Sequence, residues 1–319
     1  MSSFSLTNAE QLWCFFNQLE ERQVDIKPYL DECLIPEEAL EIADLKLTSK
    51  QNYDFLELVA RREGLPQIGW EVGRRFGAQA FGSLGIQALE QMGLDTFNEL
   101  SYQVQFHASG AHFFLLKDND KWRFCNIGSV AADSYGYAIG EFYGVAVMID
   151  LVRRSLGVKN YLPKHISLRS ANWQLLPKEL AHANVRFEQR LLSIDLPPNR
   201  IRQKRRKLVR QTTREASSFS ENIKALLSSH LTGPGVTLSQ VSSMTGISSR
   251  SIQRHLAAEG NDFRSILGEA RMLAAADVLK ETRASVAEVA AQFGFKHASH
   301  FVRAFKRCHG ITPRLYRSQ

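Results

Sequence analysis

The sequence predicts an α+β domain over residues 1–196, a link over residues 197–216, and an all-α domain over residues 217–319 with two helix-turn-helix units joined by a linker helix. Three observations predict this division. One helical pattern occurs twice in the C-terminal part, the sign of the net charge changes near residue 200, and the N-terminal part mixes helical and strand-like periods. A length of 319 residues also favours about two domains.

The N-terminal part begins with helical patterns and continues with strands. Residues 8–22 carry apolar side chains at helical spacing, and residues 49–63 do the same after a serine cap. Residues 139–156 form a further helical pattern, which Gly157 ends. Strands are expected at residues 100–106, 112–116, 121–125, 161–167, 185–187 and 191–196. The mixture is typical of an α+β domain.

The two parts carry opposite net charges. Residues 1–199 hold 19 Lys and Arg against 25 Asp and Glu, whereas residues 200–319 hold 21 against 8. Pro197 and Pro198 mark the boundary, and residues 200–214 contain eight basic side chains and no acidic one. This run is either a solvated, self-repelling link or a sequence-independent clamp on phosphates. The positive charge predicts a polyanionic partner for the C-terminal part.

The repeated pattern occurs at positions 48 residues apart. Thr237 with Gln240, and Ser285 with Glu288, have the spacing of a capping box, in which the hydroxyl accepts a hydrogen bond from the backbone three residues on. Nine residues after each cap stands a glycine that can end the helix at positive φ, and an amphipathic helix follows. These glycines are Gly246 and Gly294. Two helices joined by such a turn form a helix-turn-helix, so the repeat predicts double-stranded DNA as the partner.

Two further helices are expected around these units. Residues 217–231 carry apolar positions that would pack on the first unit, before a turn at residues 233–235. Residues 262–280 predict one amphipathic helix of about 28 Å between the units. Successive major-groove faces of B-DNA lie about 34 Å apart, so a rigid spacer of this length would let one chain place two recognition helices in successive grooves.

A C-terminal stretch of about 80 residues, from about Val236 to Arg317, resembles the AraC/XylS family of bacterial transcription regulators. The resemblance rests on both turn glycines, on Arg271 in the linker helix and on a C-terminal signature. The signature comprises Phe301, Arg303, Ala304, Phe305, Lys306, Gly310, Thr312, Pro313, Tyr316 and Arg317. The N-terminal part resembles the arabinose-binding-like regulatory domain of a subgroup of this family. That likeness is carried by Leu19, Glu20, Glu21, Val185, Arg186, Phe187, Leu191 and Leu192.

The resemblance implies a sequence-specific, DNA-binding transcription regulator that binds promoter DNA and acts with RNA polymerase. It implies an N-terminal domain that senses a small-molecule effector and forms a homodimer. The alternative is a protein-interaction and dimerisation module without a ligand. A third hypothesis, an N-terminal enzyme fused to a DNA reader, needs a catalytic constellation that the sequence does not offer, so no enzyme activity and no cofactor are predicted.

Candidate DNA contacts follow from the same resemblance. They are Ser249, Arg250, Gln253 and Arg254 in the first recognition helix, and Ser299, His300, Arg303 and Lys306 in the second. Arginine can bridge O6 and N7 of guanine, and glutamine N6 and N7 of adenine. Lys306 suits a phosphate, and the amides near Ser248 and Lys296 also suit phosphate oxygens. The alternative is that these side chains are ordinary solvated surface residues.

Other side chains give weaker signals. His107 and His112 would lie on opposite faces of a strand, which favours a structural role over a metal site. Five aromatic residues either line an effector pocket or belong to the core. These are Trp122, Tyr135, Tyr137, Tyr143 and Trp173.

The compartment is expected to be the cytoplasm. The four cysteines are scattered without a pairing pattern, which favours reduced thiols. The first ten residues lack the charge and apolar stretch of a secretory signal, and no apolar run approaches the ~20 residues of a membrane span. No membrane partner is therefore expected.

Overall fold

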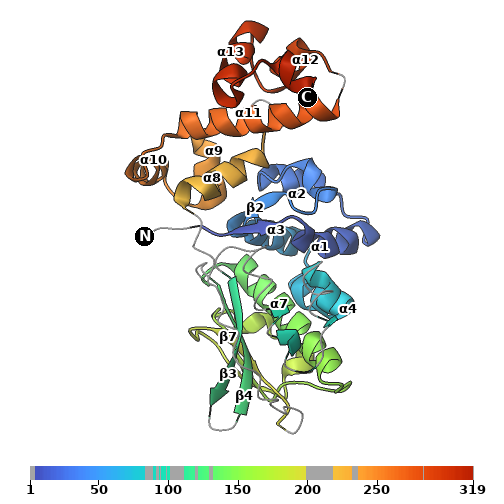
Figure 1. The fold of residues 1–319 in the computed structure, drawn as a ribbon. Coiled ribbons are helices and arrows are strands. Elements are labelled where there is room, and N and C mark those ends of the chain that lie inside the picture. The colour runs from blue at the N-terminus through green and yellow to red at the C-terminus, as the bar shows by residue number, and fades with distance from the viewer. Residues whose placement is uncertain are drawn as a thin grey trace. The chain divides into compact units, whose positions relative to one another are not determined.

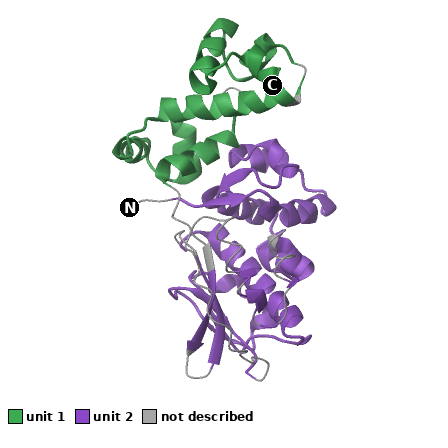
Figure 2. Ribbon diagram, in the orientation of Figure 1, with its two compact units in different colours: residues 1–2, 216–319 green, residues 3–215 purple. Residues whose placement is uncertain are grey.

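The structure is a computed structural model that describes residues 4–82, 89–90, 93, 95–97, 99–100, 111–118, 121–128, 132–198, 218–231, 236–282 and 284–318. Internal contacts divide the chain into two compact units (Figure 2). The N-terminal unit is Ser3–Glu215, and the C-terminal unit is Ala216–Gln319 together with Met1–Ser2. Each unit is described by itself.

The N-terminal unit combines helices with sheets, so the predicted α+β class is confirmed (Figure 1). Its helices are α1 (Glu10–Glu21), α2 (Lys27–Glu32), α3 (Ser49–Arg62), α4 (Ile68–Phe76) and α7 (Tyr135–Ser155). Strands β1 (Leu6–Asn8) and β2 (Lys46–Thr48) form an antiparallel pair. The larger sheet contains β3 (Ala111–Asp118), β4 (Lys121–Gly128), β5 (His165–Ser167), β6 (Asn184–Arg186) and β7 (Leu192–Asp195). Its order is β3-β4-β7-β5-β6, with only the β5–β6 pair parallel among the described strands.

Helix α7 forms the centre of the N-terminal core. It packs on α3, α4 and β7, and most of its residues are buried. Phe124 and Ile194, from the core side of the sheet, belong to the same apolar cluster. Among the described residues, α7 is the one helix long and apolar enough to span a membrane, but 72% of its apolar window is buried inside the protein. That burial fits the core helix of a folded unit.

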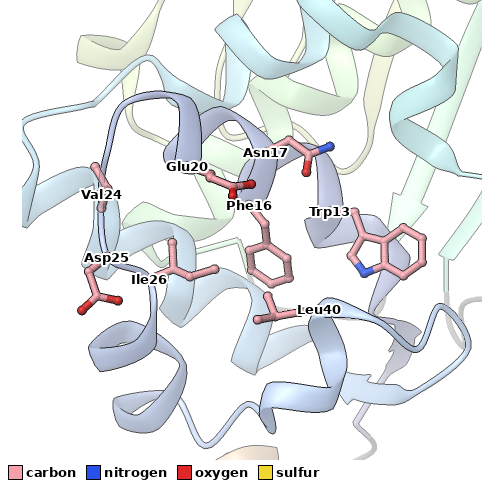
Figure 3. A pocket seen from close by; sticks show the side chains of 8 residues that line it. All are labelled: Trp13, Phe16, Asn17, Glu20, Val24, Asp25, Ile26 and Leu40. Atoms are coloured by element: carbon pink, nitrogen blue, oxygen red, sulfur yellow. The ribbon is translucent and has the colours of Figure 1, made fainter.

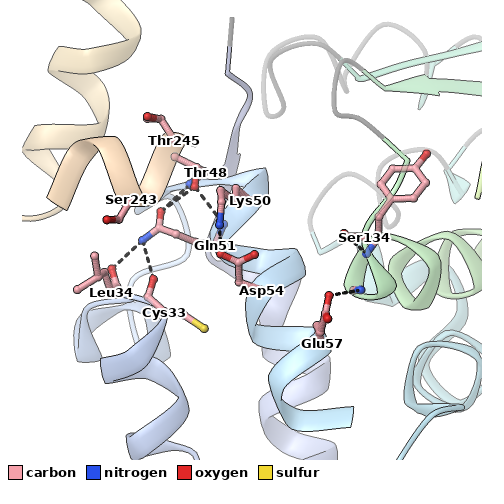
Figure 4. A network of polar contacts seen from close by, with 12 residues as sticks. Cys33, Leu34, Thr48, Lys50, Gln51, Asp54, Glu57, Ser134, Ser243 and Thr245 are labelled. Carbon is pink, nitrogen blue, oxygen red and sulfur yellow. Dashed lines mark hydrogen bonds and ion pairs between the residues drawn. The ribbon is translucent and has the colours of Figure 1, made fainter. Parts of the chain in front are cut away.

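Side chains cap two helices of this unit, α3 and α7. Thr48 caps α3 through a capping box with Gln51, whose amide also donates to the Leu34 carbonyl at 2.7 Å (Figure 4). The predicted serine cap is therefore wrong by one residue. Ser49 is followed three residues on by Asn52, whereas Thr48 has the glutamine that a capping box requires.

The buried carboxylate of Glu141 holds the segment that follows β5. It accepts hydrogen bonds from the Arg169 and Ser170 amides at 2.6 and 3.1 Å, and from the Ser170 hydroxyl at 2.7 Å. Burial raises the pKa of Glu141, and these hydrogen bonds partly offset that rise. These bonds tie α7 to the sheet side of the unit.

Several predicted N-terminal elements differ from the structure. The strand expected at residues 161–167 is confined to His165–Ser167, since Pro163 has no amide to donate to a ladder. Leu100 is helical, and residues 101–106 lie outside the described residues. Helices α2 and α4 were not predicted. One is only six residues long, and the other contains two glycines, which weaken a helical signal.

Within its described residues, the C-terminal unit contains helices and no strand, as predicted (Figure 1). Its helices are α8 (Phe219–Ser228), α9 (Leu238–Thr245), α10 (Ser249–Ala258), α11 (Phe263–Glu281), α12 (Val286–Gln292), α13 (Ala298–His309) and α14 (Pro313–Arg317). The last of these was not predicted. We call α9 with α10 the first helix pair, and α12 with α13 the second helix pair.

The capping and turn signals of both pairs are present. Thr237 and Gln240 form a complete capping box before α9, and Ser285 and Glu288 form one before α12. The turn glycines adopt positive φ, 72° at Gly246 and 79° at Gly294. Such angles cost little only for glycine, so both helices stop where the sequence predicts. Of the basic link predicted at residues 197–216, all but Pro197 and Pro198 lie outside the described residues, as does the turn at residues 233–235.

Candidate nucleic-acid interface

Helix α10 has one exposed face and one buried face. Arg250, Gln253 and Arg254 are exposed, whereas Ile252 and Leu256 are fully buried. Residues three and four apart lie on the same side of a helix, so the three exposed side chains share one face. Ser248 caps this helix by accepting from the Ser251 amide at 3.3 Å, and Ser249 is half-buried in the first turn. We call the exposed side of α10 that carries Arg250, Gln253 and Arg254 its reading face. These side chains are accessible to a partner, and their contact with bases stays a prediction.

Helix α13 repeats this division with fewer base-reading groups. Ser299, Arg303 and Lys306 are exposed and share one face, opposite the fully buried Phe301 and Phe305. His300 is also exposed, but it is turned by about 100° from Ser299, and its ring lies 5.5 Å from that of His297. The structure therefore places three of the four predicted residues on one stripe and His300 at its edge.

Signature residues of α14 contact α11 and the segment that leads into α12. The Arg317 guanidinium donates to the Leu279 carbonyl at 3.1 Å and also to the Ala284 carbonyl. Lys280 lies over the Tyr316 ring at 4.8 Å. Thr312 caps α14 and Pro313 begins it. Much of the signature is thus structural, and only Arg303 and Lys306 belong to the exposed face of α13.

The N-terminal unit contains a cleft of about 440 Å³ beside α1. Its lining comprises Trp13, Phe16, Asn17, Glu20, Val24, Asp25, Ile26 and Leu40 (Figure 3). The Trp13 indole donates to the Ala39 carbonyl at 2.8 Å, which fixes that ring at the edge of the cleft. The sequence did not predict this site, because its residues come from three segments without a shared motif.

The aromatic residues considered as pocket lining lie elsewhere. Tyr137 and Tyr143 are buried, and Trp122 and Tyr135 are half-buried against the core. Trp173 is 65% exposed. His112 lies on β3, His107 lies outside the described residues, and within the described part of the chain no three His, Cys, Asp or Glu side chains form a metal-binding group.

The family model and the relatives described next match the C-terminal part of the chain. Residues 241–319 match the family model of a helix-turn-helix domain. An uncharacterized HTH-type transcriptional regulator of Mycobacterium tuberculosis is 38% identical over 80 residues, which cover 25% of this chain and 23% of that protein. The transcriptional activator NphR of Rhodococcus sp. is 35% identical over 97 residues, which cover 30% of this chain and 29% of that protein.

One solved structure with a similar region is the C-terminal domain of AraT, a response regulator from Geobacillus stearothermophilus. It has 27% sequence identity and a TM-score of 0.28, and the match covers 31% of this chain and 83% of that one. Residues 241–319 of the C-terminal unit are a helix-turn-helix domain of the AraC/XylS type. The match spans about a quarter of the length of the curated relatives.

Proposed function

We propose that this protein is a sequence-specific DNA-binding transcription regulator that reads promoter DNA with two helix-turn-helix units. The first helix pair would present α10 to one major groove, and the second helix pair would present α13 to the next. The relatives described above are transcription regulators, a non-enzymatic role, and no catalytic role is proposed for this chain. Such a regulator acts in the cytoplasm, where bacterial promoters lie.

The observation that carries this proposal is the exposed face of α10. Two guanidinium groups and one amide stand on a helix whose opposite face is fixed by Ile252 and Leu256. A rigid helix that displays bidentate donors suits the major groove, whose base edges offer matching acceptors. The positive charge of residues 200–319 adds the sequence-independent attraction to phosphates.

The spacer supports simultaneous binding by both pairs. Helix α11 has 19 residues, a length of about 28 Å, and contacts α12, α13 and α14 of the C-terminal unit. Because both helix pairs belong to one unit, a single chain has the means to contact two groove segments on one side of the duplex.

Selection of duplexes from a random pool by the purified full chain tests the proposal. We expect enrichment of one defined sequence over many rounds at physiological salt. If the pool remains random after selection while the protein stays folded, the proposed function is contradicted.

Lys306 is expected to contact a phosphate rather than a base. Replacing it by alanine should weaken binding nearly equally for all duplexes and reduce the slope of log K against log salt by about one unit. Titrations of the selected duplex and a scrambled duplex at several salt concentrations measure both effects. A loss confined to the selected duplex would instead assign Lys306 to base recognition.

The N-terminal unit is proposed to regulate DNA binding. A small-molecule effector, for which the cleft beside α1 offers a location, is one version, and a protein-interaction or dimerisation module without a ligand is the other. The same proposal includes contact between the DNA-bound regulator and RNA polymerase. Mass spectrometry of small molecules released from the purified full chain distinguishes the first version from the second.

A further inference from the structure

The N-terminus of α8 is closed by a side chain from α10. The two oxygens of the Glu259 carboxylate accept hydrogen bonds from the Phe219 and Ser220 amides, each at 2.9 Å. Glu259 is the residue that ends α10, so these bonds join the last residue of one helix to the first turn of another. The two helices are far apart in sequence, by about 40 residues, and the contact therefore fixes tertiary structure.

The remaining amides of the first turn of α8 are occupied by its own capping box. The Ser218 hydroxyl accepts from the Glu221 amide at 3.1 Å, and the Glu221 carboxylate accepts from the Ser218 amide at 2.8 Å. The four amides at the start of a helix lack partners within it, and here all four are paired, two of them by Glu259. The positive end of the helix dipole further favours a carboxylate at this place. The Ser220 side chain, followed by the Ser220 and Phe219 amides, lowers the pKa of the Glu259 carboxyl through hydrogen bonds.

A ring contact adds to the same junction. The Phe219 and His255 rings lie 5.0 Å apart, and His255 precedes Glu259 by one turn of α10. Residues 255 and 259 lie on the side of α10 opposite the exposed face formed by Arg250, Gln253 and Arg254. The junction and the reading face therefore occupy opposite sides of one short helix.

Helix α8 is also fixed to the spacer. Lys224 forms an ion pair of 2.8 Å with Glu269 on α11, and α8 packs along α11. Thus α8 joins α10 at its start and α11 along its length. Along the chain, α10 precedes the N-terminal end of α11, and the second helix pair follows its C-terminal end.

We infer that Glu259 is a positioning residue, which sets the orientation of α10 relative to α11 and thereby the spacing between the two DNA segments that the protein reads. This inference rests on the proposed function. Glu259 acts through the α8 backbone and not by contact with DNA.

The test uses the full chain and two duplexes. One is the duplex selected from the random pool, and the other carries two additional base pairs between the segments contacted by α10 and α13. The wild type should bind the selected spacing at least about 10-fold more tightly than the altered spacing. Glu259→Gln should reduce this ratio to near one, whereas Glu259→Asp, which keeps the charge, should restore part of it. Asp277→Asn, which removes one negative charge from an exposed position on α11, should leave the ratio unchanged.

The ratio of affinities for the selected spacing and the altered spacing distinguishes a positioning role from a general loss of structure or charge. Glu259 is exposed, and the helical circular dichroism of each variant checks that it folds. If Glu259→Gln keeps the wild-type ratio, the inference is overturned while the proposed function stands. If the wild type prefers no sequence at all, both are overturned.

Discussion

Replacing Arg250 and Arg254 together by alanine is expected to abolish sequence-specific binding while leaving non-specific binding largely intact. Both side chains are exposed on one face of α10, and each bidentate contact to guanine contributes about 1 to 3 kcal/mol of discrimination. Loss of both should lower the preference for the selected duplex by roughly 30-fold to 10⁴-fold. Competition titrations of the selected duplex against scrambled DNA measure this preference.

The matched control removes the same charge from other positions. Arg264 on α11 and Arg314 on α14 are exposed but lie outside both predicted reading faces. The Arg264→Ala and Arg314→Ala double variant should weaken binding to all duplexes alike, because only phosphate attraction is reduced. Equal loss of preference in both double variants would show that Arg250 and Arg254 act only as charges.

The second large effect is a loss of stability, expected when Gly136 is replaced by alanine where α3 and α7 cross in the N-terminal unit. A Cβ atom at Gly136 would lie 1.9 Å from the Tyr53 carbonyl oxygen, a backbone atom that cannot turn aside. The helices would have to separate, and Gly136 would also shift from Glu57, which accepts from its amide at 3.1 Å (Figure 4). We expect Gly136→Ala to destabilise the unit by about 3 kcal/mol, measured by chemical denaturation.

Gly144, two turns further along α7, provides the control. A Cβ atom there meets only the Leu192 side chain at 3.6 Å, an ordinary contact. Gly144→Ala should therefore be neutral or stabilise by up to about 1 kcal/mol, because alanine is the better helix former. Equal stability of the two variants would contradict the close packing of α3 on α7.

The local signals of the C-terminal unit were readable from sequence because they act over a few residues. Thr237 and Ser285 each find their capping partner three residues on, and the turn glycines take the positive φ that the spacing predicts. The exposed and buried faces of α10 also followed from helical periodicity. Such features depend on neighbours within one or two turns.

Features that depend on tertiary contacts were not predictable in the same way. Helix α4 contains Gly69 and Gly73, which argue against a helix in isolation but allow the backbone of α7 to approach. The junction at Glu259 joins residues about 40 positions apart, and the Arg317 contacts join residues more than 30 apart. Neither pairing leaves a spacing signal that a single sequence displays.

The account depends most on the claim that one chain reads two successive groove segments through α10 and α13. Hydroxyl-radical footprinting of the full chain on its selected duplex tests this directly. We predict two protected segments on one side of the duplex, about one helical turn or roughly 10 base pairs apart. A single protected segment, or protection without a fixed position on the sequence, would contradict the claim.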